Sequence, residues 1–389
     1  MDKVRVCHMA DFHLDSKLSG NNEINKEINK KIFLSLVEIF KMLELSKVDL
    51  VLIAGDFYES SSTDFGLLSN IKEVFAKFPG KIVISPGNHD YVSIESAYHG
   101  QWPSNVHIFL KEEIEFIEFT DLNTRVYGFA FNHSHIYERI LGNFDGSQVD
   151  QTFINLGVFH GQMDQTMNSF HPIFKEDIEN SSLDYIALGH IHKRSPIEKL
   201  GDTYYSYSGN PVGRSFNEQG QKGIYLGDIS KQKNNLHFYS VNNGEFYDFT
   251  IDISDIEDNG ELAEFIKKKL KEKFSDSYSK NSYRIFLQGA IKSDFHLNLD
   301  LVKENLGHIN YIEFYDETKI RIDYESLRRE KTLKGIFVDN VLSLDCPQED
   351  KDAILDLGMK TFEGLLWLKK YILKILVSFR ILNLNLILE

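Results

Sequence analysis

Five short groups of polar residues each follow an apolar run of this sequence. They are Asp11-Phe12-His13, Gly55-Asp56, Gly87-Asn88-His89-Asp90, His160 and Gly189-His190-Ile191-His192. In an extended chain, residues i and i+2 point to the same side. Asp11 and His13 can therefore bind one centre together, and so can His190 and His192. The glycines allow the backbone to approach such a centre closely.

The donor atoms in these groups are carboxylate, imidazole and amide, with no thiolate. Such a set suits Mn, Fe or Zn better than a structural zinc cage. Seven candidate ligands exceed the need of one ion and indicate two ions that share a bridging carboxylate, about 3.5–4 Å apart. Two such ions polarise a phosphoryl oxygen and generate hydroxide near neutral pH. The candidates are Asp11, His13, Asp56, Asn88, His160, His190 and His192.

Each motif taken alone is more often a turn or a solvated face, because short patterns recur without function. The elements that must position these residues make the set more specific. Short apolar runs typical of buried strands cover residues 4–9, 50–54, 81–85, 125–131, 153–159, 185–188, 203–207 and 223–226. Apolar residues at helical spacing predict helices over 28–45 and 65–78.

Alternating strands and helices at the start of the chain predict a parallel sheet with crossover helices. The later strands follow one another more closely and indicate antiparallel or mixed pairing. Loops at the carboxyl ends of parallel strands are where α/β folds build their sites. We therefore expect one α/β sandwich to about residue 250, with the five groups gathered at one edge.

The order DxH, GD, GNHD, H and GHxH resembles the calcineurin-like metallophosphoesterase superfamily. The start VRVCHMADFHLD and the segment YSYSGNPVGRSFNEQGQKGIYLGDI resemble the SbcD-type DNA repair exonucleases, especially their YhaO-like bacterial branch. The resemblance covers about residues 1–230 and, weakly, the remainder. It implies an α/β fold: a metallophosphoesterase β-sandwich flanked by helices, with a small α/β capping domain and a C-terminal helical tail.

The resemblance also implies roles for individual residues. One metal ion would be bound by Asp11, His13, Asp56 and His192, and the second by Asp56, Asn88, His160 and His190. His89 would not be a ligand but would stabilise the transition state or protonate the leaving oxygen. Glu59 stands where relatives often have His or Asp. It would orient His89, or else be an ordinary solvent-facing loop residue.

Several residues outside these motifs have two interpretations. His8 lies in the first predicted strand and is expected to be a satisfied core or edge histidine. His133 and His135 form another HxH and are weak candidates for substrate contact, against an ordinary surface role. Arg214, in GNPVGRSF, is a candidate phosphate contact, and the alternative is a surface arginine.

Composition limits the class of protein. The chain has 389 residues, 42% of them hydrophobic, which is ample for a globular core, and its formal net charge is -15. That bulk charge repels nucleic acid, although two divalent cations would reverse it locally at the site. Two cysteines, Cys7 and Cys346, cannot form a disulfide framework. With no apolar signal segment at the start, a cytoplasmic location is expected.

The chain is expected to divide into three parts: residues 1–250, 259–335 and 336–389. The second part carries 15 Lys and Arg against 13 Asp and Glu, so it is the one relatively basic region. Its lysine run at 267–273 would suit phosphate contacts, although such runs are usually solvated helix faces. By resemblance this part is a capping domain that positions DNA. The last part would dock an ATPase partner.

The end of the chain, LLWLKKYILKILVSFRILNLNLILE, is apolar but interrupted by basic residues. No run reaches about 18 apolar residues, so a membrane span is not expected, although an amphipathic helix is possible. A third interpretation is that residues 366–387 overlap another gene. Permissible AT-rich codons read in another frame give MVKKIYFKNFGKFQNFEFEFN, which resembles the start of SbcC-type ATPases.

The resulting hypothesis is a DNA phosphodiesterase with two divalent ions, expected to be Mn. It would act as an exonuclease or endonuclease in DNA end processing with an SbcC-like coiled-coil ATPase. The resemblance also implies a homodimer joined through the first helices. A metallophosphoesterase for a small phosphoester or phosphoprotein is the alternative. A binding module with an incidental metal site is a further one, but the complete ligand set weighs against it.

Overall fold

The computed structural model describes residues 3–16, 22–60, 64–163, 168–231, 233–241, 244–292 and 294–362. The chain divides into two compact units. The first contains the described residues of 1–250, 264–286 and 303–315, and the second contains those of 251–263, 287–302 and 316–362. The predicted tail helix and the overlapping-frame segment at 366–387 lie outside the described residues.

Two six-stranded sheets form the centre of the first unit. One sheet has the order β14-β13-β1-β2-β3-β4, and the other β11-β12-β10-β7-β6-β5. The first sheet consists of β1 (Val4–Met9), β2 (Leu50–Ile53), β3 (Lys81–Ile84), β4 (Val106–Ile108), β13 (Gly223–Ser230) and β14 (Lys233–Ser240). The second consists of β5 (Glu115–Phe119), β6 (Thr124–Gly128), β7 (Ile154–His160), β10 (Tyr185–Gly189), β11 (Glu198–Leu200) and β12 (Thr203–Tyr207).

Both sheets are mixed, whereas the sequence predicts a parallel sheet for the start of the chain and antiparallel or mixed pairing only for the later strands. In the first sheet β1 to β4 run parallel, and β13 and β14 add antiparallel strands at the β1 side. In the second sheet β6, β7, β10 and β12 run parallel, with β5 and β11 antiparallel at the edges. The parallel strands therefore bring their carboxyl ends, and the loops that follow them, to one edge of each sheet.

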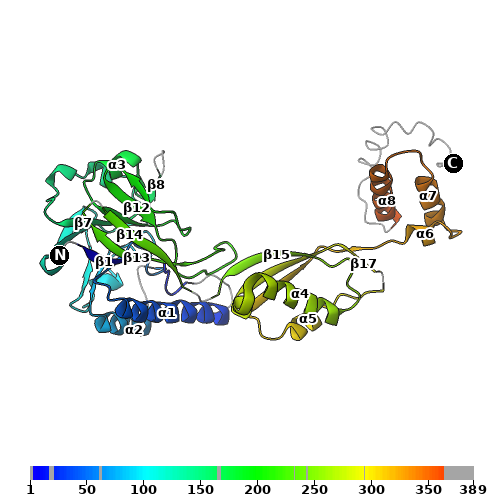
Figure 1. Cartoon of the computed structure of the whole chain (residues 1–389), viewed down its shortest axis with the longest axis horizontal. Helices are drawn as coiled ribbons and strands as arrows, with labels where there is room; N and C mark the ends of the chain where they lie inside the picture. The colour runs from blue at the N-terminus through cyan, green and yellow to red at the C-terminus, as the bar shows by residue number, and fades with distance from the viewer. Residues whose placement is uncertain are drawn as a thin grey trace. The chain divides into compact units, whose positions relative to one another are not determined.

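Side chains on the two faces of β1 show how the sheets and helices are layered. Val4 and Val6 pack between the two sheets, whereas Cys7 and Met9 pack on the opposite face against helices. Those helices are α1 (Asn22–Leu45) and α2 (Phe65–Lys77), which run beside β1 in Figure 1. A third apolar cluster covers the outer face of the second sheet and includes Ile178 of α3 (Lys175–Glu179). The expected α/β sandwich flanked by helices is confirmed.

The later elements are shorter. They are β15 (Phe246–Asp252), α4 (Asn259–Phe274), β16 (Ser282–Gln288), β17 (Ala290–Ile291), α5 (Leu299–Leu306), β18 (Tyr311–Asp316) and β19 (Lys319–Ile320). Strands β15, β16 and β18 form a three-stranded sheet. Three helices follow: α6 (Tyr324–Leu327), α7 (Leu333–Leu342) and α8 (Gln348–Phe362). Two minor strands, β8 (Gln162–Met163) and β9 (Pro172–Ile173), pair with each other.

Several predicted boundaries differ from the structure. Helix α1 begins at Asn22 instead of 28. The strand predicted over 125–131 ends at Gly128. Residues 259–335 contribute elements to both compact units. No helix in the described part of the chain is long and apolar enough to cross a membrane.

Candidate metal centre

The loops that follow β1 and β2 pair with each other beyond the ends of their strands. The backbone N–H of Asp11 donates to the carbonyl of Gly55 at 3.0 Å, and that of His13 donates to the carbonyl of Asp56 at 2.9 Å. Asp11, His13 and Asp56 adopt left-handed backbone conformations, with φ of 56°, 48° and 49°. These conformations are unusual for residues with side chains. They cluster here because the loops must turn three donor side chains toward one point.

The two sheets come very close together at this edge. A Cβ atom on Gly189 would lie 1.7 Å from the carbonyl oxygen of Ala54, so no other residue fits at that position. Because the backbones approach so closely, the N–H of His190 reaches the Asp11 carboxylate at 3.0 Å. The loop after β10 is thereby tied to the loop after β1, which brings donors from both sheets into one centre.

All seven predicted ligands lie at this centre. One group consists of Asp11, His13 and His192, and another of Asp56, His160 and His190, with the donor atoms in each group within 4.8 Å of one another. The amide oxygen of Asn88 joins the second group, 2.9 Å from His160 Nε2 and 3.1 Å from His190 Nδ1.

Asp56 lies between the two groups. Its Oδ2 atom is 3.6 Å from His13 Nε2 and 3.3 Å from His160 Nε2. One carboxylate oxygen thus faces both sets of donors, which is the position that a bridging ligand requires.

Two further carboxylates fix the tautomers of His13 and His192. Glu59 accepts from His13 Nδ1 and Glu218 accepts from His192 Nδ1, each at 2.8 Å. Ionised carboxylates only accept hydrogen bonds, so the Nδ1 atoms carry the protons and both Nε2 atoms present lone pairs. Those Nε2 atoms lie 3.0 Å apart. Two lone pairs at this distance repel each other unless a cation binds them, so the residues fit a metal ion.

The electrostatics of the centre favour positive charge. Burial opposes ionisation of Asp56, but attraction to the imidazoles of His160 and His13 outweighs it, so the pKa of this carboxyl lies well below its usual range. Burial also opposes protonation of His160, yet Asp56 raises its pKa to about 9. A cation at this point, whether a proton or a metal ion, is therefore stabilised.

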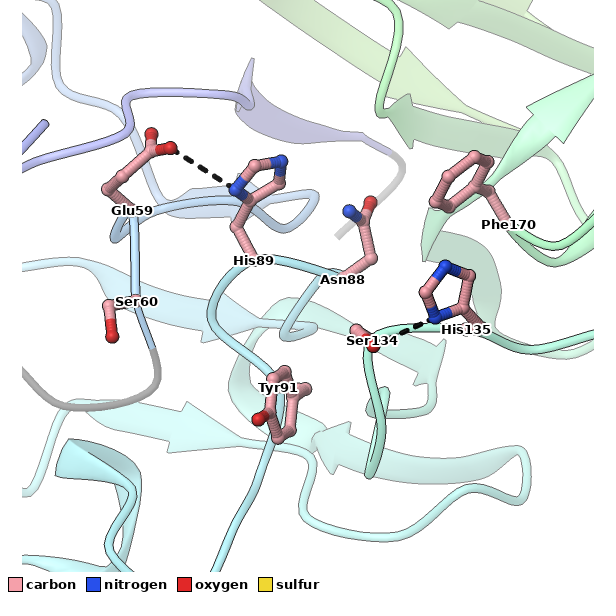
Figure 2. Close-up of a pocket in the computed structure, with 8 residues that line it drawn as sticks. All are labelled: Glu59, Ser60, Asn88, His89, Tyr91, Ser134, His135 and Phe170. Carbon is pink, nitrogen blue, oxygen red and sulfur yellow. Dashed lines mark hydrogen bonds and ion pairs between the residues drawn. The ribbon is translucent and has the colours of Figure 1, made fainter. Parts of the chain in front are cut away.

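His89 stands at the rim of the centre. Its side chain is 41% exposed, and its Nδ1 lies 3.3 Å from Glu59 (Figure 2). The hydrogen bond to Glu59 raises the pKa of His89 above its ordinary value. Glu59 contacts His13 as well as His89, so it joins the rim to the buried donors. Its predicted position beside His89 is found, and its contact with His13 was not foreseen.

Arg214 is not the surface arginine of one interpretation, and its phosphate contact stays a prediction. It is 8% exposed, and its guanidinium contacts both carboxylates that orient the histidines. It donates to Glu218 at 2.7 Å and to Glu59 at 3.3 Å. The planar guanidinium group has five N–H donors and can therefore bind two carboxylates at once. Glu218, four residues after Arg214, was missed because its histidine partner is remote in sequence.

Asp90 is a second residue whose role the sequence does not reveal, although it ends the GNHD motif. Its buried carboxylate accepts from the backbone N–H groups of Asp56, Phe57, Tyr58 and Gly87, at 2.6–3.3 Å. Tyr98 also donates to it from its hydroxyl at 2.5 Å. Asp90 therefore holds the loops after β2 and β3 in register, so that Asp56 and Asn88 meet.

Three histidines outside the donor set, His8, His133 and His135, lie in different environments. His8 is fully buried, its Nδ1 is paired with the Tyr185 hydroxyl at 2.7 Å, and its Nε2 is paired with the Leu188 carbonyl at 3.1 Å, as expected of a core histidine. His135 lines an open pocket beside Asn88 and His89, whereas His133 is not among the residues that line it. The two members of this HxH are thus in different environments.

The calcineurin-like phosphoesterase family model matches residues 4–194, a range that contains all seven donor residues. Residues 4–194 therefore belong to the calcineurin-like metallophosphoesterases. That family and the clustered donors imply binding of divalent metal.

Three relatives illustrate the similarity. The uncharacterized metallophosphoesterase YhaO of Bacillus subtilis is 30% identical over 247 residues, covering 59% of this chain and 60% of YhaO. The SbcD component of the SbcCD nuclease of Staphylococcus epidermidis is 26% identical, covering 59% of this chain and 67% of SbcD. The DNA double-strand break repair protein Mre11 of Methanocaldococcus jannaschii is 27% identical over 371 residues, covering 87% of this chain and 92% of Mre11. The match spans less than two thirds of YhaO.

Proposed function

We propose that this protein is a DNA phosphodiesterase that uses two divalent metal ions, and that both ions are Mn. The observation that carries the proposal is the position of Asp56, whose Oδ2 faces His13 of one donor group and His160 of the other. The first ion would be held by Asp11, His13, Asp56 and His192. The second would be held by Asp56, Asn88, His160 and His190.

The bound ions would polarise the phosphoryl oxygens and lower the pKa of water to near neutral. The residues of the chain position the metal ligands and supply a proton donor. Asp90 holds the Asp56 and Asn88 loops together, and Glu59 and Glu218 aim the lone pairs of His13 and His192. His89 is exposed at the rim, and its hydrogen bond to Glu59 raises its pKa, which favours the protonated imidazole that would donate to the leaving oxygen.

DNA is proposed as the substrate because two of the relatives are named as part of a nuclease and as a double-strand break repair protein. We further propose that it acts as an exonuclease or endonuclease in DNA end processing, with an SbcC-like ATPase, in the cytoplasm. Residues 1–250 would be the nuclease domain and 259–335 a capping domain that positions DNA. In its lysine run, Lys268 and Lys269 pair with Glu272 at 4.0 and 3.8 Å, so the charge available for phosphate is reduced.

Residues 336–389 are proposed to dock the ATPase. Helix α7 leaves Leu333 and Ile336 exposed, at 74% and 58%, which supports a partner on this helix. A homodimer through the first helices is proposed as well, on the resemblance to the SbcD-type nucleases. Leu333 and Ile336 lie one turn apart on α7, and exposed apolar residues mark interaction surfaces when they lie together.

The test uses full-length protein with Mn on linear duplex and single-stranded DNA, with and without the ATPase. Wild type should release nucleotides, and Asp56→Asn should release none. His89→Gln should bind metal but lose about 10²–10⁴-fold in rate, as expected for a general acid. His237→Gln, at an exposed histidine of β14, is the matched control and should match wild type. Cleavage of a chromogenic phosphodiester without any cleavage of DNA would favour the alternative, a small phosphoester or phosphoprotein substrate.

A further inference from the structure

An open pocket of about 430 Å³ adjoins the candidate metal centre. On one side it is bounded by Asn88 and His89, and on the other by Phe170 and His135 (Figure 2). Tyr91 lines it from below in the same view. Its volume is within the range of about 300–1,000 Å³ found for small-ligand sites. A group attached to a phosphorus atom at the metal centre would enter this pocket.

The far wall of the pocket is a series of stacked rings. Phe170 lies over His190 with ring centroids 4.8 Å apart and an interplanar angle of 31°. His135 stacks on Phe170 at 5.6 Å and 29°, and Tyr137 on His135 at 6.4 Å and 14°. The series therefore leads outward from a candidate metal ligand. Phe170 is half-buried and His135 is exposed, so part of each ring remains open to the pocket and can receive another flat ring.

The polar groups of the pocket favour an uncharged occupant. The residues that line it are Glu59, Ser60, Asn88, His89, Tyr91, Ser134, His135 and Phe170, and none of these is Lys or Arg. Glu59 is already paired with Arg214 and His89, and the lining supplies neither lysine nor arginine to a second phosphate or an acidic peptide. An uncharged aromatic ring needs no such cation. Ser134 contacts His135 Nδ1 at 2.8 Å, which helps to hold the imidazole in its stacked orientation.

We propose that Phe170 and His135 form a stacking subsite for the nucleobase of the nucleotide next to the scissile phosphodiester. The proposal rests on the proposed function, since it assumes that the phosphorus lies at the metal centre. It adds a reason for preferring nucleotides to other phosphoesters. Stacking on an aromatic side chain accepts every base, so this subsite would select for the presence of a base and not for its sequence.

The experiment compares two substrates that have the same leaving group, p-nitrophenolate. Thymidine 5′-(p-nitrophenyl) phosphate carries a base, and its 1-deoxyribose counterpart has hydrogen in place of the base. Both are assayed with Mn-loaded, full-length protein by p-nitrophenolate release. We expect wild type to favour the base-bearing substrate in kcat/KM by at least about 5-fold, the lower bound for one stacked base. In addition, 2-aminopurine deoxyribonucleoside 5′-monophosphate should lose fluorescence on binding, because stacking quenches it.

Variants then test whether the preference for the base-bearing substrate comes from His135 and Phe170. In His135→Ala and Phe170→Leu the ratio of the two kcat/KM values should fall toward one, and Phe170→Tyr should restore it. His133→Ala is the matched control, since His133 is 76% exposed and lies two residues from His135. A wild-type ratio near one, or an equal loss of ratio in His133→Ala, would overturn the subsite while the phosphodiesterase stands. Cleavage of neither substrate would overturn the proposed function and the subsite with it.

Discussion

The Nε2 atoms of His13 and His192 face each other at 3.0 Å, although these histidines follow strands of different sheets. Their Nδ1 atoms are each committed to a carboxylate, Glu59 for one and Glu218 for the other. Both rings therefore direct lone pairs at the same point. Without a cation the two loops repel each other there, and with one they are joined. The two sheets are thus linked at this edge through whatever cation binds.

Metal binding should therefore raise the thermal stability of the whole first unit. A ligand at 100 times its dissociation constant contributes about 2.7 kcal/mol to the folded state. Addition of Mn should raise the melting temperature measured by calorimetry, and EDTA should reverse the rise. Asp56→Asn should abolish the response. The matched control is Asp202→Asn, whose side chain is 83% exposed in a surface turn. An equal response in both variants would contradict binding at this centre.

Substitution of Arg214 should weaken metal binding without touching a ligand. Its guanidinium holds Glu218 and Glu59, which in turn orient His192 and His13. Loss of such an orienting contact typically costs about 10–100-fold in metal affinity. We expect this loss for Arg214→Gln in a Mn titration by calorimetry, and a smaller loss for Arg214→Lys, which keeps the charge but not the fork. Arg328→Gln, at an arginine of the second unit that pairs with Asp339, should bind as wild type does.

Asp90→Asn should destabilise the fold even when no metal is bound. The carboxylate accepts four backbone N–H groups and the Tyr98 hydroxyl, and an amide offers one acceptor oxygen in place of two. Buried donors left unpaired cost about 1–3 kcal/mol each, so we expect a loss of roughly 2–4 kcal/mol in urea unfolding of metal-free protein. Tyr98→Phe removes one contact and should cost about 1 kcal/mol. Equal losses in the two variants would contradict a central role for Asp90.

His8 should make the protein less stable in acid. Burial lowers its pKa from 6.5 to about 3. Between these values the unfolded chain binds a proton that the folded chain rejects, so stability falls as pH drops below about 6.5, by at most about 1.4 kcal/mol per pH unit. His8→Gln should reduce the difference between unfolding free energies measured at pH 7.5 and pH 5. His237→Gln should leave that difference unchanged, and a reduction there as large as for His8→Gln would count against His8 as its source.

Much of the candidate centre could be predicted from the sequence because each ligand lies at the end of a strand or within a few residues after it. Spacing along the chain was enough to place Asp11 and His13 on one loop and to bring the DxH, GD and GNHD motifs to one sheet edge. The same reasoning could not find Glu218 or the true position of Arg214. The partners of Arg214 at Ser16 and Glu59 are reached only when the chain folds back, and a local pattern contains no record of that contact.

The secondary structure also divides into elements that a local pattern predicts and elements that it does not. Strands buried on both faces, such as β1 and β2, are continuous apolar runs and were predicted within one residue. Strands that are half exposed, such as β5 and β14, were missed because their polar faces resemble loops. The stacked series from His190 to Tyr137 was also missed, since Phe170 and His135 are remote in sequence and neither forms a motif with the other.

The left-handed backbone at Asp11, His13 and Asp56 has a consequence for the evolution of this chain. Conformations of this kind cost about 1–3 kcal/mol each, less for Asp than for His. The residues that would perform the chemistry are therefore among those that the fold tolerates least. A descendant freed from catalysis would gain stability by accepting glycine or asparagine at these sites. The stability contributed by a bound cation opposes that drift, so the centre would be lost most readily in a descendant that neither binds metal nor needs the activity.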